Sequence, residues 1–289
     1  MAKIIMGCMS WGAWGKKQSI KEQADLIQFC VENGNTIFDH ADLYGDYTTE
    51  AEFGNAFLES GIARKEIQLI SKCGIQNPGQ TRSNNLKYYN YSKDYIIWSV
   101  EESLRNLKTA YLDTFLLHRP SPLMQPDEIA EAVRLLQKSG KIRAFGVSNF
   151  TPSQVALIHS KIPVSVNQIE FSLTQCEGMY NGTLDYLLEK EIHPMVWSPL
   201  GTVFKVENKQ TIRIKAVLQK LSNKYQLSEA ALLLAFILKH PAKVSPVIGT
   251  TNKARILNAN KAVKTQLELG DWFELLAASQ GHEVPLPIH

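Results

Sequence analysis

Three ionisable side chains of different types lie at the ends of short apolar segments, and a tyrosine lies in the loop that follows one of them. Asp39 and Tyr44 belong to the segment FDHADLYGDY, Lys72 ends IQLISK, and His118 ends LDTFLLH. A tyrosine with a pKa of about 10 is a poor proton donor at neutral pH unless a nearby cation stabilises its phenolate. A lysine about 4 Å away contributes roughly 4 kcal/mol at an effective dielectric of about 20, and a carboxylate beside it keeps the lysine charged. Together these residue types could protonate a carbonyl oxygen.

Each of the four residues has a distinct expected role. Asp39 would hold Lys72, Lys72 would lower the pKa of Tyr44, and Tyr44 would act as the general acid. His118 would orient the oxygen that receives the proton. The sequence offers no thiolate or serine–histidine nucleophile and no metal-ligand spacing, so we expect hydride from a bound cofactor and no metal site. Taken singly, each residue also fits a structural role, and only their convergence on one site favours catalysis.

Alternating strands and helices explain how these residues could meet. The expected strands are 3–8, 36–40, 67–72, 112–118, 142–148, 164–169, 193–198 and 244–249, and runs of helical periodicity separate them. Ser92 and Thr151 are expected as helix N-caps, with Gly34 and Gly140 at helix ends. Eight such units predict an α/β protein, a (β/α)8 TIM barrel with its active site at the C-terminal ends of the strands.

An open doubly wound sheet is the alternative fold. Such sheets usually carry a glycine-rich turn after the first strand, but this chain has no GxGxxG and no GxxxxGK[ST] segment. No Pro/Ser-rich linker and no shift in composition divides the chain. We therefore expect one barrel domain over residues 1–289.

Composition narrows the class of protein. The formal net charge is +3 over 289 residues, which argues against a nucleic-acid-binding or membrane-surface protein. The four cysteines are widely spaced, as in reduced cytoplasmic proteins. The N-terminus lacks a secretory apolar region, and the longest apolar stretch, 230–238, is about half the length that a bilayer requires. We expect a monomeric cytoplasmic protein.

Seven segments, in order along nearly the whole chain, resemble the aldo-keto reductase family. They are FDHADLYG, LISKCG, LDTFLLHRP, GKIRAFGVSNF, VNQIEFS, VWSPLG and VIGTTNKARI. The resemblance implies a (β/α)8 barrel that binds NADP(H) in an extended form and reduces an aldehyde or ketone to an alcohol by hydride transfer. It places the family's catalytic tetrad on Asp39, Tyr44, Lys72 and His118.

The resemblance also implies which residues bind the cofactor. Those expected at the nicotinamide ring and its carboxamide are Ser148, Asn149, Gln168 and Trp197. Those expected along the pyrophosphate are Ser198, Leu200 and Gly201. Those expected at the adenosine end are Thr250, Thr251, Arg255 and Asn258. The planar fork of Arg255 suits the oxygens of a 2′-phosphate.

Several positions depart from the family pattern. His40 stands where the family often has threonine or serine, and we expect a structural role for it. Gly249 stands where many NADPH-preferring members carry lysine, so the expected preference for NADPH depends on Arg255. The loop 74–92 is long and rich in tyrosine. We expect this loop and Trp11 to form the wall of the substrate site, next to Tyr44 and His118. Such a site would suit small or diverse carbonyl compounds rather than steroids.

Two other functions remain as alternatives. A nicotinamide-binding, redox-sensing or regulatory subunit with little turnover could retain the same tetrad. A barrel lyase could use Lys72 as a Schiff base if that lysine were desolvated and away from Asp39.

In the segment FDHADLYGDY, which contains Tyr44, we expect Asp42, Asp46 and Tyr47 at the surface of the loop.

Overall fold

The computed structural model describes residues 4–284. Eight parallel strands form a closed barrel in the order β1-β10-β9-β8-β7-β6-β3-β2, which confirms the predicted fold. These strands are β1 (Ile5–Gly7), β2 (Ile37–Asp39), β3 (Gln68–Cys73), β6 (Leu112–Leu117), β7 (Ile142–Ser148), β8 (Val166–Glu170), β9 (His193–Trp197) and β10 (Ser245–Ile248). Each of them lies within two residues of its expected position.

Helices separate the strands along the chain, as the sequence predicts. They are α1 (Ile20–Glu32), α2 (Tyr44–Tyr47), α3 (Thr49–Ser60), α4 (Lys93–Asn106), α5 (Pro126–Lys138), α6 (Pro152–His159), α7 (Thr183–Glu189), α8 (Lys209–Tyr225), α9 (Glu229–Leu238), α10 (Lys253–Val263) and α11 (Leu269–Gln280). Short 3-10 turns lie at Arg64–Glu66 and Glu177–Met179. Among the helices of residues 4–284, none is both long enough and apolar enough to cross a bilayer.

The chain divides into two compact units. The first comprises Ile5–Gln168 and Gly249–Lys253. The second comprises Ile4, Ile169–Ile248 and the described residues from Ala254 onward. The expectation of one domain over residues 1–289, like those of a monomeric state and a cytoplasmic location, stays a prediction.

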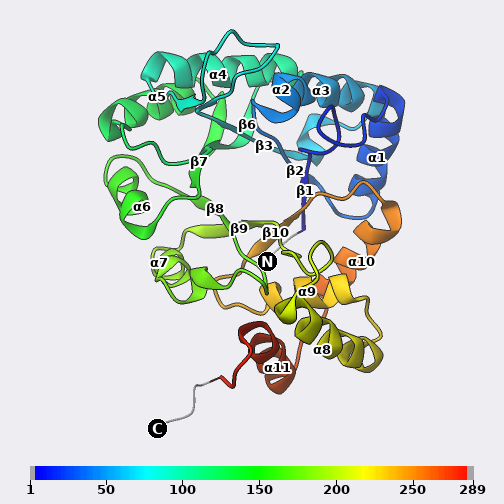
Figure 1. Cartoon of the computed structure of the whole chain (residues 1–289). Coiled ribbons are helices and arrows are strands. Elements are labelled where there is room, and N and C mark those ends of the chain that lie inside the picture. Colours follow the sequence, from blue (N-terminus) through cyan, green and yellow to red (C-terminus); the bar gives the residue numbers. More distant parts are fainter. Residues whose placement is uncertain (1–3, 285–289) are drawn as a thin grey trace. The chain divides into compact units, whose positions relative to one another are not determined.

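In the first unit, six strands lie side by side and their helices cover the outer face, from α1 to α6 (Figure 1). The local sequence starts and stops these helices as predicted. Ser92 accepts a hydrogen bond from the third residue of α4, and Thr151 caps α6 in the same way. Gly34 and Gly140 follow α1 and α5 with positive φ angles of 81° and 72°. Such angles favour glycine, because other residues meet a Cβ clash there.

In the second unit, β9 and β10 pair in parallel, and α8 packs against α11 and α9. Trp272 of α11 stacks on Phe236 of α9 with ring centroids 4.7 Å apart, and its indole N–H donates to the Phe236 carbonyl at 2.9 Å. The nearly continuous apolar sequence of α9 is buried, which explains why that helix lacks a polar face.

Candidate active site

Parallel pairing in the first unit brings the predicted tetrad to one edge of the sheet. Asp39 ends β2, Lys72 lies near the end of the neighbouring strand β3, and His118 directly follows β6. The amide of His118 donates to the carbonyl of Cys73, the last residue of β3, at 2.9 Å. Tyr44 is the first residue of α2, in the loop that follows β2. The carboxyl ends of parallel strands therefore gather residues that lie far apart in the sequence.

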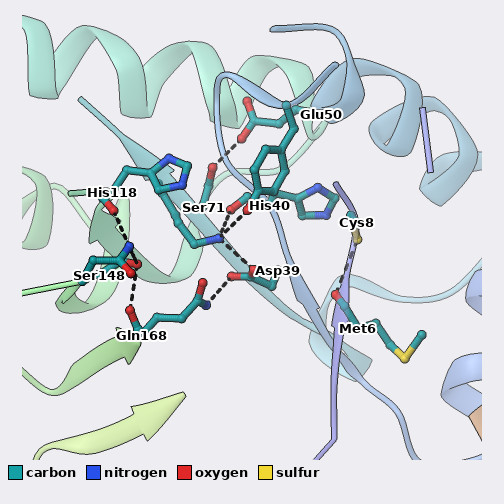
Figure 2. Close-up of polar contacts among 12 residues, drawn as sticks. Met6, Cys8, Asp39, His40, Glu50, Ser71, His118, Ser148 and Gln168 are labelled. Carbon is teal, nitrogen blue, oxygen red and sulfur yellow. Dashed lines mark hydrogen bonds and ion pairs between the residues drawn. The ribbon is translucent and has the colours of Figure 1, made fainter. Parts of the chain in front are cut away.

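The ammonium group of Lys72 donates to three groups of the site, two of which belong to Asp39 and His40, both labelled in Figure 2. It donates to Asp39 Oδ2 at 2.7 Å, to the carbonyl of His40 at 2.8 Å and to the Tyr44 hydroxyl at 3.3 Å. The second carboxylate oxygen of Asp39 accepts from Gln168 Nε2 at 3.0 Å. The side chain of Lys72 is fully buried, so its charge has protein partners in place of water.

Charges and burial act in opposite directions on Tyr44 and Lys72. Burial works to lower the pKa of Lys72, but Asp39 and Tyr44 outweigh it and the pKa is raised, so the ammonium stays charged. Burial raises the pKa of Tyr44 above its ordinary value, while Lys72 works to lower it. Lys72 thus acts in the predicted direction, but burial outweighs it. At neutral pH the phenol therefore holds a proton that it can donate.

The imidazole of His118 faces the phenol ring of Tyr44. The ring centroids lie 5.9 Å apart and the planes meet at 80°. Burial, with help from Lys72, lowers the pKa of His118 well below its ordinary value, so the ring is neutral. A neutral imidazole carries one N–H donor, which can orient a carbonyl oxygen by a hydrogen bond while the ring itself stays uncharged. Within the described residues, Nδ1 of this ring is buried and has no hydrogen-bond partner.

His40 contributes its backbone rather than its ring. Its carbonyl accepts from Lys72, whereas its imidazole lies edge-on to Phe53 with centroids 4.3 Å apart. Burial lowers the pKa of His40 to about 3, and neither ring nitrogen has a hydrogen-bond partner in the part of the chain that the structure describes. The ring is thus a neutral core side chain, in line with the structural role expected for it.

Three residues predicted to bind the nicotinamide carboxamide adjoin the tetrad. The Ser148 hydroxyl donates to the Gln168 carbonyl at 2.9 Å, and Asn149 Nδ2 donates to Ser148 Oγ at 2.9 Å and to the His118 carbonyl at 3.2 Å. Asn149 has a φ of 62°, a left-handed conformation that asparagine tolerates. Side-chain amides supply both donors and acceptors, which are the groups a carboxamide needs.

The other predicted cofactor residues lie in both units, and their contacts with a cofactor stay predictions. In the second unit, Trp197 ends β9 and Ser198 follows it with a φ of 50°. Leu200 is half-buried in the turn that follows. Gly201 has a φ of 55°, and a Cβ there would lie 2.0 Å from Thr174 Oγ1, so this turn requires glycine.

The residues predicted at the adenosine end belong to two segments. Thr250 and Thr251, in the first unit, are half-buried and follow Gly249. Arg255 is exposed and Asn258 half-buried on α10, three residues apart and so on the same helical face. These contacts too stay predictions.

The two tryptophans that follow β1 have opposite environments. Trp11, predicted at the substrate wall, is fully buried against Phe38 and Phe53, with ring centroids 6.0 and 5.9 Å away. It is therefore a core residue in this structure. Trp14, which the sequence reasoning did not single out, is 46% exposed and its ring lies 6.3 Å from that of Tyr44. A second tryptophan three residues after the first was the available signal.

The loop 74–92 folds back onto the residues that follow Tyr44. It contains a small hairpin of β4 (Ile75–Gln76) and β5 (Tyr88–Tyr89). The carboxylate of Asp46 accepts from the amides of the loop at positions 80 and 81, at 2.9 and 3.2 Å. Tyr47 is buried, and the guanidinium of Arg82 lies 3.6 Å from the centroid of its ring. Asp46 and Tyr47 therefore anchor the loop, instead of forming the open surface that the sequence indicated.

Two buried carboxyl groups behind the tetrad were not anticipated. Asp42 is 5% exposed, and its side chain accepts from Tyr95 and Ser99, each at 3.2 Å. Glu50 is 2% exposed and accepts from the Ser71 hydroxyl at 2.5 Å. Burial raises the pKa of Asp42 to about 6 and that of Glu50 to about 7. Asp42 was expected at the surface because its polar neighbours in sequence resemble a loop.

Cys8 and Cys73, the latter next to Lys72 in sequence, have buried side chains. The four cysteines are free, and burial raises the pKa of the Cys8 and Cys73 thiols well above the ordinary value. Thiols of this kind are poor nucleophiles because the thiolate is the reactive form. Within residues 4–284, no group of three or more His, Cys, Asp or Glu side chains could hold a metal ion.

The chain is similar to known proteins over nearly its whole length. The model of the Aldo/keto reductase family matches residues 3–278. The chain is 39% identical to the uncharacterized oxidoreductase YcsN of Bacillus subtilis, covering 98% of this chain and 96% of that protein. It is also 39% identical to a 6-dehydroglucose reductase of Agrobacterium fabrum, again covering 98% and 96%.

A solved structure has the same fold. It is a thermostable aldo-keto reductase, Tm1743, crystallised with the inhibitor epalrestat. The TM-score is 0.82 at 21% sequence identity, with 96% of this chain and 95% of that chain covered. The resemblance seen in the seven sequence segments is confirmed: this chain belongs to the aldo/keto reductase family of oxidoreductases.

Proposed function

We propose that this chain reduces an aldehyde or ketone to an alcohol, with NADPH as the hydride donor. The observation that carries the proposal is the buried ammonium of Lys72, held between the carboxylate of Asp39 and the hydroxyl of Tyr44. Family membership and the oxidoreductase names of the relatives support carbonyl reduction in general.

Tyr44 is the proposed general acid. Its raised pKa keeps the phenol protonated before the reaction, and Lys72 stabilises the phenolate that remains after the proton has moved to the carbonyl oxygen. The neutral ring of His118 donates an N–H that orients this oxygen beside the phenol. A lyase mechanism would need Lys72 uncharged and apart from Asp39, and the 2.7 Å ion pair argues against it.

The nicotinamide cofactor, when bound, supplies the hydride. Ser148, Asn149 and Gln168 are the proposed carboxamide ligands, since they cluster beside the tetrad and present amide and hydroxyl groups. The preference for NADP(H) over NAD(H) rests on Arg255, whose exposed guanidinium is the proposed 2′-phosphate ligand.

We propose small polar carbonyl compounds as the substrate class. Two relatives are 6-dehydroglucose reductases, at 39% and 31% identity, and one is a glyoxal reductase at 31%. The exposed ring of Trp14, beside Tyr44, is the proposed substrate wall in place of Trp11. An aromatic face of this kind can pack against the apolar C–H face of a sugar.

Cofactor titration followed by a substrate panel tests the proposal. Fluorescence titration should give a lower Kd for NADPH than for NADH, and Arg255→Ala should remove most of that difference. NADPH oxidation is then followed with 6-dehydroglucose, glyoxal, simple aldehydes and a steroid ketone. Turnover of the polar aldehydes supports the reductase. Tight NADPH binding without turnover of any compound would favour the regulatory subunit, and equal Kd values would contradict the role of Arg255.

A further inference from the structure

Both backbone polar groups of His118 form hydrogen bonds. Its amide donates to the Cys73 carbonyl at 2.9 Å, and its carbonyl accepts from Asn149 Nδ2 at 3.2 Å. Within the described residues, Nδ1 of the imidazole has no hydrogen-bond partner. No side-chain hydrogen bond at that nitrogen fixes the ring, so its direction toward Tyr44 depends on where the backbone places it.

The hydroxyl of Tyr91 forms hydrogen bonds with the backbone of Arg119, the residue that follows His118. It donates to the carbonyl of Arg119 at 2.5 Å and accepts from the amide of Arg119 at 3.1 Å. The Tyr91 hydroxyl thus forms a hydrogen bond with each of the two backbone polar groups of Arg119. Because Arg119 precedes Pro120, its own backbone is already restricted toward extended conformations.

Tyr91 itself packs against Gly74, the residue that follows β3. Its side chain is 6% exposed, and it packs so closely on Gly74 that a Cβ at that position would lie 2.0 Å from Tyr91 Cε1. Gly74 has a φ of 116°, and its carbonyl accepts from the amide of Asn90 at 2.9 Å. Burial raises the pKa of Tyr91 well above the ordinary value, so the hydroxyl keeps the proton that it donates.

We propose that Tyr91 is a positioning residue for His118: its hydroxyl fixes the backbone at Arg119 and thereby the direction of the imidazole toward Tyr44. The inference rests on the proposed function, in which His118 orients the carbonyl oxygen. Tyr91 touches neither Tyr44 nor Lys72 through any hydrogen bond among the described residues, so its influence reaches the site through His118.

The test combines Tyr91→Phe with His118→Asn. Tyr91→Phe removes one oxygen and should lower kcat about tenfold, with the Kd for NADPH unchanged. In the His118→Asn background the same change should alter kcat less than twofold, because the ring that Tyr91 positions is gone. An equal loss in both backgrounds, or no loss in the wild-type background, overturns the proposal.

A matched control separates positioning from general stability. The hydroxyl of Tyr225 also bonds on two sides, to the carboxylate of Asp271 and to the amide of Glu268, but it belongs to the second unit. Tyr225→Phe should leave kcat unchanged. If Tyr91→Phe does not fold, Arg119→Gly is compared with Arg119→Ala. The glycine variant should have the lower kcat because it frees the backbone that Tyr91 holds, and equal values overturn the proposal.

A readout that needs no turnover distinguishes this inference from the proposed function. The imidazole ¹⁵N–¹H resonances of His118, assigned by their loss in His118→Asn, should shift in Tyr91→Phe, while those of His193 in the second unit stay in place. Unmoved His118 resonances overturn the inference even in an active enzyme. Shifted resonances in a protein that reduces no carbonyl would retain the positioning and reject only the proposed reaction.

Discussion

The carboxylate of Asp39 lies 2.7 Å from the ammonium of Lys72, and the two side chains are 3% and 0% exposed. A buried ion pair of this kind is costly to desolvate and adds little net stability by itself. In the proposed mechanism, the pair keeps a cation beside the hydroxyl of Tyr44, which Lys72 contacts at 3.3 Å. The stability of this pair and the chemistry of the site are therefore linked.

Asp39→Asn should weaken both stability and activity. The substitution leaves the buried ammonium without its counter-charge, which typically costs about 3 kcal/mol or more in the free energy of unfolding. Urea denaturation and kcat measurement check this. Asp113→Asn is the matched control, since Asp113 pairs with Arg64 at 2.6 Å with both side chains less than 20% exposed. It should lower stability and leave kcat unchanged; an active Asp39→Asn enzyme would count against the account.

The rate of reduction should vary little between about pH 7 and 9. The pKa of Tyr44 is raised, so the acid form persists above its ordinary value of about 10. The pKa of His118 is lowered well below about 6.5, so the ring does not gain a proton in this range. A profile of kcat/KM against pH checks this. A decline centred near pH 7 would show that one of the two groups titrates there.

Glu50→Gln should stabilise the protein more at pH 8 than at pH 5. Burial raises the pKa of Glu50 to about 7, so between about pH 4.5 and 7 the folded protein holds a proton that the unfolded chain releases. Stability from this group is present at low pH and falls as pH rises, by up to about 1.4 kcal/mol for each pH unit. Thermal unfolding at several pH values measures it. Glu59→Gln, at an exposed position of α3, should show no such trend.

Most of the barrel was predictable because strands buried on both faces leave a strong sequence pattern. The meeting of Asp39, Lys72 and His118 was also predictable, since these side chains lie at or next to the ends of neighbouring apolar strands, and Tyr44 follows in the loop after β2. The burial of Asp42 and Trp11 could not be predicted, because each lies in a loop with polar or glycine-rich neighbours in sequence and is buried only by tertiary contacts. The net pKa of Tyr44 was beyond sequence reasoning as well: the charge of Lys72 can be inferred, but the opposing effect of burial depends on packing.

Gly249→Lys should strengthen NADPH binding. The nearest atom to a Cβ at this position is Ser10 Oγ at 3.9 Å, so a Cβ meets no clash there. A lysine here would add a cation at the position where NADPH-preferring family members carry one, and a contribution of about 1 kcal/mol corresponds to roughly fivefold in Kd. Titration with NADPH and NADH checks this. Gly270→Lys on α11, also sterically free, should change neither Kd.

The most direct test of the central claim is single-turnover reduction by Tyr44→Phe with NADPH and the best carbonyl substrate. The variant keeps the ring and loses only the hydroxyl that Lys72 contacts at 3.3 Å. A general acid typically contributes about 10²- to 10⁴-fold, so the rate constant should fall at least a hundredfold while the Kd for NADPH stays the same. Reduction at the wild-type rate would contradict the assignment of Tyr44 as the acid.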